Sequence, residues 1–315
     1  MKRPATLSFA LCLMSLVCIF PIPSAAAALP TGLTSIVAGV NVTEGALNDA
    51  KTQMIQEVGI TWLRMDVVFH NDWGFQTNYA IARQHGLSFI GTLDYWTLAN
   101  NNSFTLADWN RTVALAQATY PSITVWEIWN EPIYNRLGYF DGSPQHYLQM
   151  LSSAYAILKA GNPLCTVVGL GGANLGNSND VNFARSLLAL GAGAKMDALS
   201  IHAYAPDLNK GDTWEYYQGI WLKDLAIYKQ FGKPIWVTET GLQAGQMTEA
   251  DQALFMSEVY HFFQVQGAAA LVWWCLIDYT SQGTQTTWGL LRSDMTERPV
   301  ADILRSLAQM TPRRR

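Results

Sequence analysis

The sequence predicts a single (β/α)8 TIM barrel, an α/β fold in which eight parallel strands alternate with helices. Eight short apolar runs alternate with helix-like segments along the chain. Most of these runs are continuously apolar, as strands of a parallel sheet buried on both faces must be. The length of 315 residues suits about two average domains, but α/β barrels of this size fold as one. A doubly wound open sheet is the alternative, and no glycine-rich dinucleotide-binding pattern follows the first run.

The expected strands are short, and two of them stop at a glutamate. They are Ile36–Val42, Ile60–Val67, Ser88–Asp94, Thr124–Glu131, Thr166–Gly171, Ala198–Ala203, Pro234–Glu239 and Ala269–Leu276. In the fourth strand, Pro132 follows Glu131 directly, and proline cannot continue a hydrogen-bonded ladder. We therefore expect this strand to end at or just before Glu131.

The expected helices lie between these strands and have recognisable ends. Ser143 and Pro144 form an N-cap and a first helical residue, and the helix that they open stops at Gly161. Thr248 and Asp251 resemble a capping box that opens a helix to Gln266. The other helices are expected at Asn48–Val58, Asn78–Gln84, Leu106–Ala118, Phe183–Leu190, Trp214–Phe231 and Pro299–Met310. We expect residues 29–315 to form one catalytic domain.

The composition is that of a globular chain with a sizeable core, because half of the residues are apolar and 14% are charged. The formal net charge is −4, and the one basic cluster is the terminal 313–315. Nucleic acid is therefore not an expected partner. Cys165 and Cys275 each lie in an apolar run, and we expect two buried free thiols rather than a disulfide. We expect the protein to be a monomer.

Residues 1–28 have the pattern of a secretory signal peptide. Lys2 and Arg3 precede an apolar run from Leu7 to Phe20, and small residues follow at Ala25–Ala28. The apolar run is short for a bilayer span, so an anchoring helix is the less favoured interpretation. We expect a secreted or periplasmic protein with no membrane attachment after this segment is removed.

Catalytic groups of such a barrel gather at the carboxyl ends of its strands. Glu131 and Glu239 both follow apolar strands, so each would place a carboxylate at that end. A carboxylate there is costly unless it has a partner or a chemical role. Two facing carboxylates suit hydrolysis of a glycosidic bond, because one donates a proton to the leaving oxygen while the other attacks the sugar or activates water. Neighbouring carboxyl groups also push each other's pKa values apart, which separates the two roles.

The motifs around these glutamates resemble those of the retaining clan A glycoside hydrolases, with family 39 most similar and family 5 next. The resemblance lies in Trp129-Asn130-Glu131-Pro132, Trp236-Val237-Thr238-Glu239-Thr240-Gly241, Ser200-Ile201-His202-Ala203-Tyr204 and Leu63-Arg64-Met65-Asp66. It implies a TIM barrel with Glu131 as the acid/base and Glu239 as the nucleophile.

The same resemblance implies roles for neighbouring residues in binding the substrate. Asn130 would hydrogen-bond to the 2-hydroxyl of the sugar, and Arg64 would keep the nucleophile ionised. His202 and Tyr204 would form the sixth-strand motif, with Tyr204 bonded to the nucleophile. A tryptophan at the end of the eighth strand, Trp273 or Trp274, would lie under the reacting sugar.

Several of these residues have a competing structural interpretation. Asn41, at the end of the first strand, is a candidate for substrate binding but also begins an N-glycosylation sequon. Trp96 follows the third strand, where it would either stack on a sugar face or shape the rim. Arg64 lies on the same side of its strand as Asp66, and Glu127 lies on the same side of its strand as Glu131. Arg64 could therefore form an internal ion pair with Glu127, and we expect Glu127 to be a buried structural residue. His202 has the alternative of a core histidine.

No metal site and no cofactor are expected, because the five histidines are scattered without ligand spacing. The main hypothesis is a secreted retaining β-glycoside hydrolase that cuts within a β-linked polysaccharide such as an exopolysaccharide, mannan, xylan or glucan. It would act by double displacement through a covalent glycosyl-enzyme intermediate. The alternatives are an exo-acting β-glycosidase such as a β-xylosidase, a transglycosylase and, from a different class, a non-catalytic carbohydrate-binding barrel.

Overall fold

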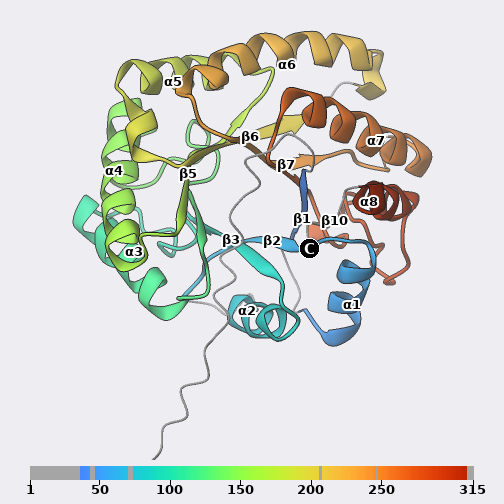
Figure 1. Cartoon of the computed structure of the whole chain (residues 1–315), viewed down its shortest axis with the longest axis horizontal. Coiled ribbons are helices and arrows are strands. Elements are labelled where there is room, and N and C mark those ends of the chain that lie inside the picture. The colour runs from blue at the N-terminus through green and yellow to red at the C-terminus, as the bar shows by residue number, and fades with distance from the viewer. Residues whose placement is uncertain (1–35, 43–46, 70–73, 206–207, 246, 311–315) are drawn as a thin grey trace, which may run out of the picture.

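The computed structural model describes residues 36–42, 47–69, 74–205, 208–245 and 247–310. These residues form a closed barrel of eight parallel strands, in which each strand pairs with the next and the last returns to the first. Helices surround the barrel (Figure 1). The predicted (β/α)8 TIM barrel is confirmed. The expected signal peptide, residues 1–28, lies outside the described residues.

The strands and helices alternate along the chain. The barrel strands are β1 (Val37–Asn41), β2 (Trp62–Asp66), β3 (Ser88–Leu93), β4 (Val125–Ile128), β5 (Thr166–Asn174), β6 (Ala198–Tyr204), β7 (Ile235–Gly241) and β8 (Ala270–Trp273). The helices are α1 (Asp49–Glu57), α2 (Phe75–Gln84), α3 (Leu106–Thr119), α4 (Pro144–Gly161), α5 (Ser178–Ala189), α6 (Trp214–Tyr228), α7 (Glu249–Gln266) and α8 (Pro299–Met310). A small hairpin, β9 (Thr280–Ser281) and β10 (Thr284–Gln285), follows β8. Among the described helices, none is both long and apolar enough to cross a membrane.

Two helices begin earlier than the sequence suggests. α2 begins at Phe75 instead of Asn78, and α5 begins at Ser178 instead of Phe183. The side chain of Asn177 caps α5 by accepting a hydrogen bond from the second residue of that helix. Because the first turn of α5 is polar, apolar periodicity does not reveal where the helix starts.

Two apolar layers hold the barrel together. Its interior is filled from alternate strand positions, where the rings of Trp62 and Trp236 meet edge to face with centroids 5.9 Å apart. A second layer packs the outer faces of the strands against the helices and includes the fully buried Trp126. Cys165 and Cys275 are buried thiols, as predicted, with no disulfide between them. Because side chains alternate along a strand, the parity of a residue decides which layer it enters.

The fourth strand ends earlier than predicted. β4 stops at Ile128 rather than at Glu131, because the backbone of Trp129 and of Glu131 is left-handed, with φ of 71° and 46°. Residues other than glycine rarely adopt this conformation, and it is concentrated at functional sites. The turn directs Trp129 into the helix layer, where its indole lies against Phe140, and directs Glu131 toward the mouth of the barrel.

Two further strands are irregular at the same end of the barrel. β5 continues past the predicted end at Gly171 to Asn174, through a shift in pairing between Gly169 and Ala173. β7 also shifts its pairing, close to its carboxyl end. β-Bulges of this kind redirect side chains and are frequent beside active sites.

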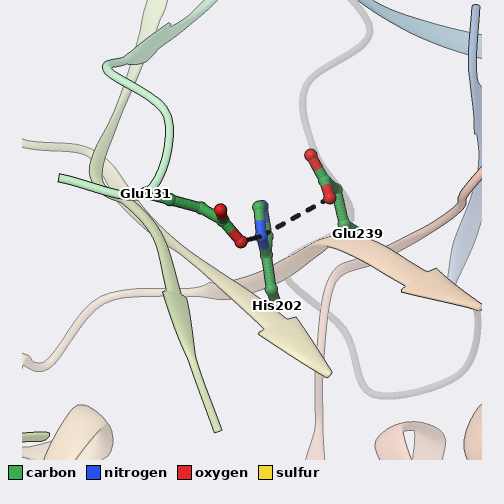
Figure 2. Close-up of side chains that lie close together, drawn as sticks. All are labelled: Glu131, His202 and Glu239. Atoms are coloured by element: carbon green, nitrogen blue, oxygen red, sulfur yellow. Dashed lines mark hydrogen bonds and ion pairs between the residues drawn. The ribbon is translucent and has the colours of Figure 1, made fainter. Parts of the chain in front are cut away.

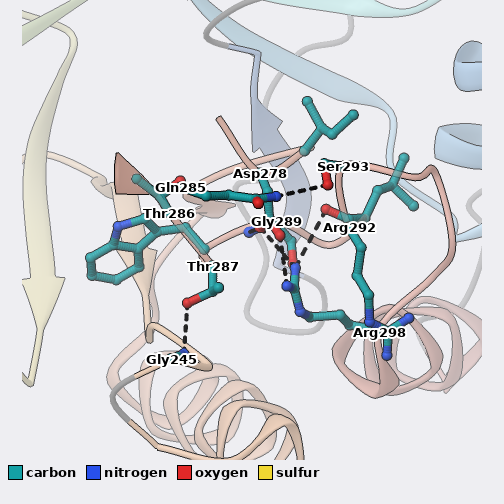
Figure 3. Close-up of polar contacts among 12 residues, drawn as sticks. Gly245, Asp278, Gln285, Thr286, Thr287, Gly289, Arg292, Ser293 and Arg298 are labelled. Atoms are coloured by element: carbon teal, nitrogen blue, oxygen red, sulfur yellow. Dashed lines mark hydrogen bonds and ion pairs between the residues drawn. The ribbon is translucent and has the colours of Figure 1, made fainter. Parts of the chain in front are cut away.

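The segment after β8 is fixed by a buried ion pair (Figure 3). Arg298 donates hydrogen bonds of 2.8 Å and 2.6 Å to the two carboxylate oxygens of Asp278. The backbone N–H of Gly289 donates to the same carboxylate at 2.8 Å. These contacts position the chain around Trp288, whose ring lies against Tyr204 with centroids 5.7 Å apart.

Candidate active site

The carboxyl ends of β4, β6 and β7 bring Glu131, His202 and Glu239 together (Figure 2). Nδ1 of His202 lies 3.1 Å from Oε1 of Glu131 and 3.5 Å from Oε2 of Glu239. One carboxylate oxygen of Glu131 and one of Glu239 lie within 4.8 Å of each other. The two glutamates that the sequence singles out therefore face each other across a narrow gap.

Glu239 reaches this gap because β7 is bulged. Its neighbour Thr238 already points into the barrel, where the hydroxyl donates a hydrogen bond of 2.9 Å to the buried Glu127. In a regular strand Glu239 would then point outward, toward the helices. The shift in pairing at this point removes the alternation. Oε2 of Glu239 accepts a hydrogen bond of 2.8 Å from the hydroxyl of Tyr204, the contact that the family resemblance implies.

Glu131 is held in place by the bulge of β5. Its backbone N–H donates to the carbonyl of Gly171 at 2.6 Å, and its carboxylate accepts from Nδ2 of Asn174 at 3.1 Å. Gly172 has a left-handed backbone, with φ of 74°. A Cβ atom on Gly172 would lie 2.1 Å from Nε2 of His202. The glycine therefore leaves the space that the imidazole needs beside Glu131.

Arg64 is the centre of the buried hydrogen-bond network. Its Nε donates to Glu127 at 2.5 Å, and its Nη1 donates to Glu239 at 2.6 Å. Nη1 and Nη2 also donate to the side-chain oxygens of Asn41 and Asn130, both at 2.9 Å. Burial alone would lower the pKa of Arg64, but the surrounding carboxylates outweigh it and raise the pKa. The guanidinium therefore remains charged within the barrel.

The structure combines the two interpretations of Arg64 that the sequence left open. Arg64 forms the internal ion pair with Glu127 and also contacts Glu239 at the mouth. Glu127 is fully buried, and burial acts to raise its pKa. The charges of Arg64 and His202 and the hydrogen bonds that Glu127 accepts outweigh burial, so the pKa of this carboxyl is lowered. Glu127 is an ionised support beneath the site.

His202 and Glu131 influence each other's protonation. Burial opposes a charge on the imidazole, but the negative charges of Glu239 and Glu131 raise the pKa of His202. Burial also acts to raise the pKa of Glu131, but hydrogen bonds from His202 and Asn174 more than offset it and lower the pKa. A proton donor works best with its pKa near the operating pH. Since 28% of the Glu131 side chain faces solvent, a sugar that covers it would strengthen desolvation and raise this pKa.

Glu131, His202 and Glu239 also have a spacing that a metal ion could bridge, since each offers one atom within 4.8 Å of the others. Arg64 and Tyr204 already donate to the two oxygens of Glu239. A cation there would lie beside the guanidinium of Arg64 and compete with both donors. The arrangement suits a pair of catalytic carboxylates better than a metal centre.

Two cavities adjoin the site: Glu131 lines the first, and Arg64, which hydrogen-bonds to Glu239, lines the second. The first, of about 440 Å³, is bordered by segments that follow β4, β5 and β6, and its lining includes Glu131, Tyr134, Asn174, Tyr204, Asp212 and Tyr216. The second, of about 310 Å³, is bordered by the ends of β1, β2, β3 and β8, and its lining includes Asn41, Arg64, Asp66, Phe75, Trp96 and Trp274. Both volumes are in the range of ligand-binding pockets.

The tryptophans at the end of β8 differ in position. Trp274 lines the second cavity, together with Trp96 from the loop after β3. Trp273 lines neither of the two cavities: it is fully buried against Phe255 of α7, and its Nε1 donates to the carbonyl of Trp288. Trp273 has the strand parity of the outer layer, so of the two candidates Trp274 is placed to meet a sugar.

Sequence reasoning missed Asn174, Tyr134 and Tyr216. Asn174 lies beyond the expected end of the fifth strand and reaches Glu131 only because the bulge extends that strand. Tyr134 and Tyr216 line the first cavity with 52% and 54% of their surface exposed. Exposed aromatic rings beside a cavity are a signal for sugar stacking, but sequence alone does not show which tyrosines are exposed.

Comparison with known proteins gives one family and a common fold. The family model described as "Glycosyl hydrolase catalytic core" matches residues 46–303. No curated protein matches the chain significantly. Among solved structures, the chain resembles a family 39 glycoside hydrolase from Bacteroides cellulosilyticus WH2, with 21% identity, a TM-score of 0.66, and 88% of this chain and 64% of that chain covered.

Two further structures share the barrel at lower identity. They are xylanase 10B from Thermotoga maritima, with 14% identity, a TM-score of 0.62 and coverage of 88% and 95%, and a beta-glucuronidase from Faecalibacterium prausnitzii, with 14% identity, a TM-score of 0.64 and coverage of 89% and 49%. The chain thus spans 64% of the Bacteroides enzyme and about half of the glucuronidase. At these identities the likeness concerns the fold.

Proposed function

The chain belongs to the glycosyl hydrolase catalytic core family, and from this we propose that it is a retaining β-glycosidase that cuts within a β-linked polysaccharide. It is a glycosidase of the clan A type, and its substrate is a carbohydrate. The observation that carries the proposal is the Glu131–Glu239 pair with two adjoining cavities.

The spacing of the two carboxylates supports a retaining mechanism. Retaining enzymes separate their carboxyl groups by about 5–5.5 Å, whereas inverting enzymes leave about 6.5–9.5 Å for a water molecule. The carboxylates of Glu131 and Glu239 approach within 4.8 Å, which matches the shorter class.

The partners of each carboxylate divide the two roles. Glu239 accepts hydrogen bonds from Arg64 and Tyr204, which orient it as a nucleophile toward the anomeric carbon. Glu131 borders the first cavity, so a leaving group seated there places its glycosidic oxygen beside the proton donor. Glu131 transfers its proton to the glycosidic oxygen, the bond between that oxygen and the anomeric carbon breaks, and Glu239 forms a covalent bond to the same carbon. Glu131 then removes a proton from water, and the attack of that water releases the sugar with its configuration retained.

Cleavage within a polysaccharide is supported by the two cavities that adjoin the Glu131–Glu239 pair. Tyr134 and Tyr216 offer exposed rings on the leaving-group side, and Trp96 and Trp274 border the other cavity. Space for sugar units in both cavities supports endo action, because an exo-acting enzyme closes its binding site at one end.

The products distinguish the proposed function from its alternatives. The purified protein would be incubated with β-glucans, mannans, xylans and bacterial exopolysaccharides, and chain length would be followed by chromatography. Early fragments of mixed length support endo action, whereas steady release of one small sugar supports an exo-glycosidase. Longer products formed with an added acceptor would indicate a transglycosylase. NMR of the first product must show the retained β-anomer, and an α-anomer would contradict the mechanism.

Glu239→Gln tests the nucleophile, and Glu131→Ala tests the acid. We expect Glu239→Gln to lose activity by about 10³-fold or more on every substrate. Glu131→Ala should lose far more on substrates with a sugar leaving group than on an aryl glycoside with an acidic phenol, which leaves without a proton. A Glu239→Gln variant as active as the parent would point to a non-catalytic binding barrel or another nucleophile.

Export is part of the proposal and is supported by the sequence of residues 1–28. Expression of the full chain in a bacterial host, followed by N-terminal sequencing of the exported protein, tests it. Cleavage after the alanines at 25–28 is the expected result, and an uncleaved protein that stays in the cytoplasm would contradict export.

A further inference from the structure

Asp66 has an unusual position in the second cavity. It is the last residue of β2, two positions after Arg64, and its partly exposed side chain lines the cavity with Trp96, Trp274 and Phe75. No feature of the retaining mechanism uses this carboxyl group. It ends the second-strand motif Leu63-Arg64-Met65-Asp66, to which the family resemblance contributes a role for Arg64 alone.

The carboxylate of Asp66 has no hydrogen-bond or ion-pair partner among the described residues, although Arg64 is close by. Arg64 directs its donors to the oxygens of Glu127, Glu239, Asn41 and Asn130 instead. The other carboxylates of the site all accept hydrogen bonds. A carboxylate that is largely removed from water without a partner destabilises a fold, so its presence is better explained by a ligand.

A second acid, Asp94, lies close behind Asp66, and burial raises its pKa well above the usual value. Asp94, in the loop after β3, is fully buried, and its Oδ1 accepts the backbone N–H groups of Trp96 and Thr97. Its Oδ2 is buried without a partner among the described residues, and its proximity makes ionisation of Asp66 and Asp94 mutually unfavourable. Asp94 therefore lies behind the cavity wall, and Asp66 is the acid that lines the cavity itself.

The second cavity also has two aromatic rings in its lining, beside Asp66. Trp96 and Trp274 border it from two different strands, and flat indole rings pack against the apolar faces of sugars. A sugar held by such rings presents its equatorial hydroxyl groups sideways, where a carboxylate can accept two hydrogen bonds at once. Asp66 is the lining residue with free acceptors for such a pair.

We propose that Asp66 selects the sugar unit bound in the second cavity: it accepts hydrogen bonds from hydroxyl groups or an ammonium group and repels the carboxylate of a uronic acid. The inference deepens the proposed function and rests on it. The lining of this cavity includes Arg64, the partner of Glu239, and not Glu131, so the selected unit is the sugar that Glu239 attacks. Like charges brought together in a site with little water are strongly unfavourable.

The test compares matched substrates. The probes are 4-nitrophenyl β-glycosides of glucose, mannose and galactose, each beside the corresponding 2-amino sugar and the corresponding uronic acid. For the parent protein we expect kcat/KM on the best neutral or amino sugar to exceed that on the matching uronide by about 100-fold or more. Faster hydrolysis of the amino sugar identifies an ammonium group as the partner of Asp66, and faster hydrolysis of the neutral sugar identifies hydroxyl groups.

Asp66→Asn removes the charge at nearly constant volume. We expect it to lower kcat/KM on the preferred sugar and to narrow the preference over the uronide at least tenfold, without lowering the melting temperature. The matched control is Asp302→Asn, the same change at a side chain that is 72% exposed on α8, which should leave the preference unchanged. Asp66→Ser is a second variant in case the amide disturbs the site.

Three results would overturn the inference. The parent could hydrolyse uronides as well as neutral sugars, or Asp66→Asn could keep the parent preference within twofold. A melting temperature that falls in both Asp66 variants, with parallel losses on all sugars, would assign Asp66 a structural role. Absence of hydrolysis of every aryl glycoside and every polysaccharide by the parent would instead contradict the proposed function, so the two failures are distinguishable.

Discussion

Nη1 of Arg64 donates a hydrogen bond of 2.6 Å to Oε1 of Glu239, and the same guanidinium reaches Glu127 at 2.5 Å through Nε. One buried cation thus neutralises one acid beneath the site and one acid at its mouth. Loss of this cation would leave two carboxylates close together without compensation, which links the stability of the barrel to its chemistry.

Arg64→Met should therefore reduce both stability and activity. Removal of one partner from a buried ion pair costs about 3–5 kcal/mol, and we expect a loss of this size in urea denaturation. Arg64→Lys keeps the charge but cannot make the four hydrogen bonds of the guanidinium, so it should lose less stability and still lower kcat by about 100-fold. Equal activity of the lysine variant and the parent would show that the geometry of the guanidinium is unimportant.

Asn174→Ala should shift the pH dependence of the reaction. Asn174 donates to the carboxylate of Glu131 and helps to lower its pKa, so the variant should have a higher pKa at this carboxyl. Because the first step needs Glu131 protonated, the basic limb of kcat/KM should move to higher pH. In the parent, the basic limb of kcat should lie above that of kcat/KM, since bound sugar desolvates Glu131. The account would be contradicted if the basic limbs of kcat and kcat/KM coincided in the parent and the basic limb of kcat/KM did not move in Asn174→Ala.

Asp66→Asn should stabilise the protein at neutral pH. Burial, the largest cause, raises the pKa of Asp66 from 3.8 to about 6. A raised carboxyl pKa means that the folded state holds the proton more tightly than the unfolded state. Ionisation of Asp66 therefore destabilises the folded state. This effect is absent below about pH 4, grows as pH rises to about 6, and is complete above that. We expect the variant to gain about 1–3 kcal/mol at pH 7.5 and almost nothing at pH 4, measured by urea denaturation at both pH values.

Gly172→Ala should damage the site through His202. The new Cβ would lie 2.1 Å from Nε2 of the imidazole, and the left-handed backbone at this position is unfavourable for alanine. We expect a loss of about 2–3 kcal/mol in stability and a fall in kcat, because His202 is displaced from Glu131. Gly211→Ala has the same kind of backbone, with φ of 105°, but open space around its Cβ. It should lose stability without the loss of kcat, and equal kcat values for the two variants would contradict the role of Gly172.

Much of the site could be predicted from where the apolar strands stop. Glu131 and Glu239 each follow a strand whose residues are apolar, and a parallel barrel brings all such ends to one rim. The pairing of Arg64 with Glu127 was also accessible, since both occupy inward positions of their strands. These inferences need only two facts: side chains alternate between the two faces of a strand, and the strands follow one another around the barrel in sequence order.

The rest depends on local departures from a regular strand. Asn174 reaches Glu131 because β5 bulges, and Glu239 turns toward the mouth because β7 shifts its pairing. A bulge changes the parity of every later residue in its strand. Its position is set by packing against neighbouring strands, which the sequence of one strand does not reveal.

The contacts of Arg64 have a consequence for how the enzyme acquires its activity during folding. They join β2 to β1, β4 and β7, and the partner on β7 is 175 residues away in the chain. Contacts between such distant residues form slowly, because a large loop must close before they stabilise anything. A half-formed barrel would contain Glu131 without Glu239, and would therefore be inert. Recovery of hydrolysis after dilution from denaturant thus reports the closure of the barrel, and it should follow the recovery of helical signal rather than accompany it.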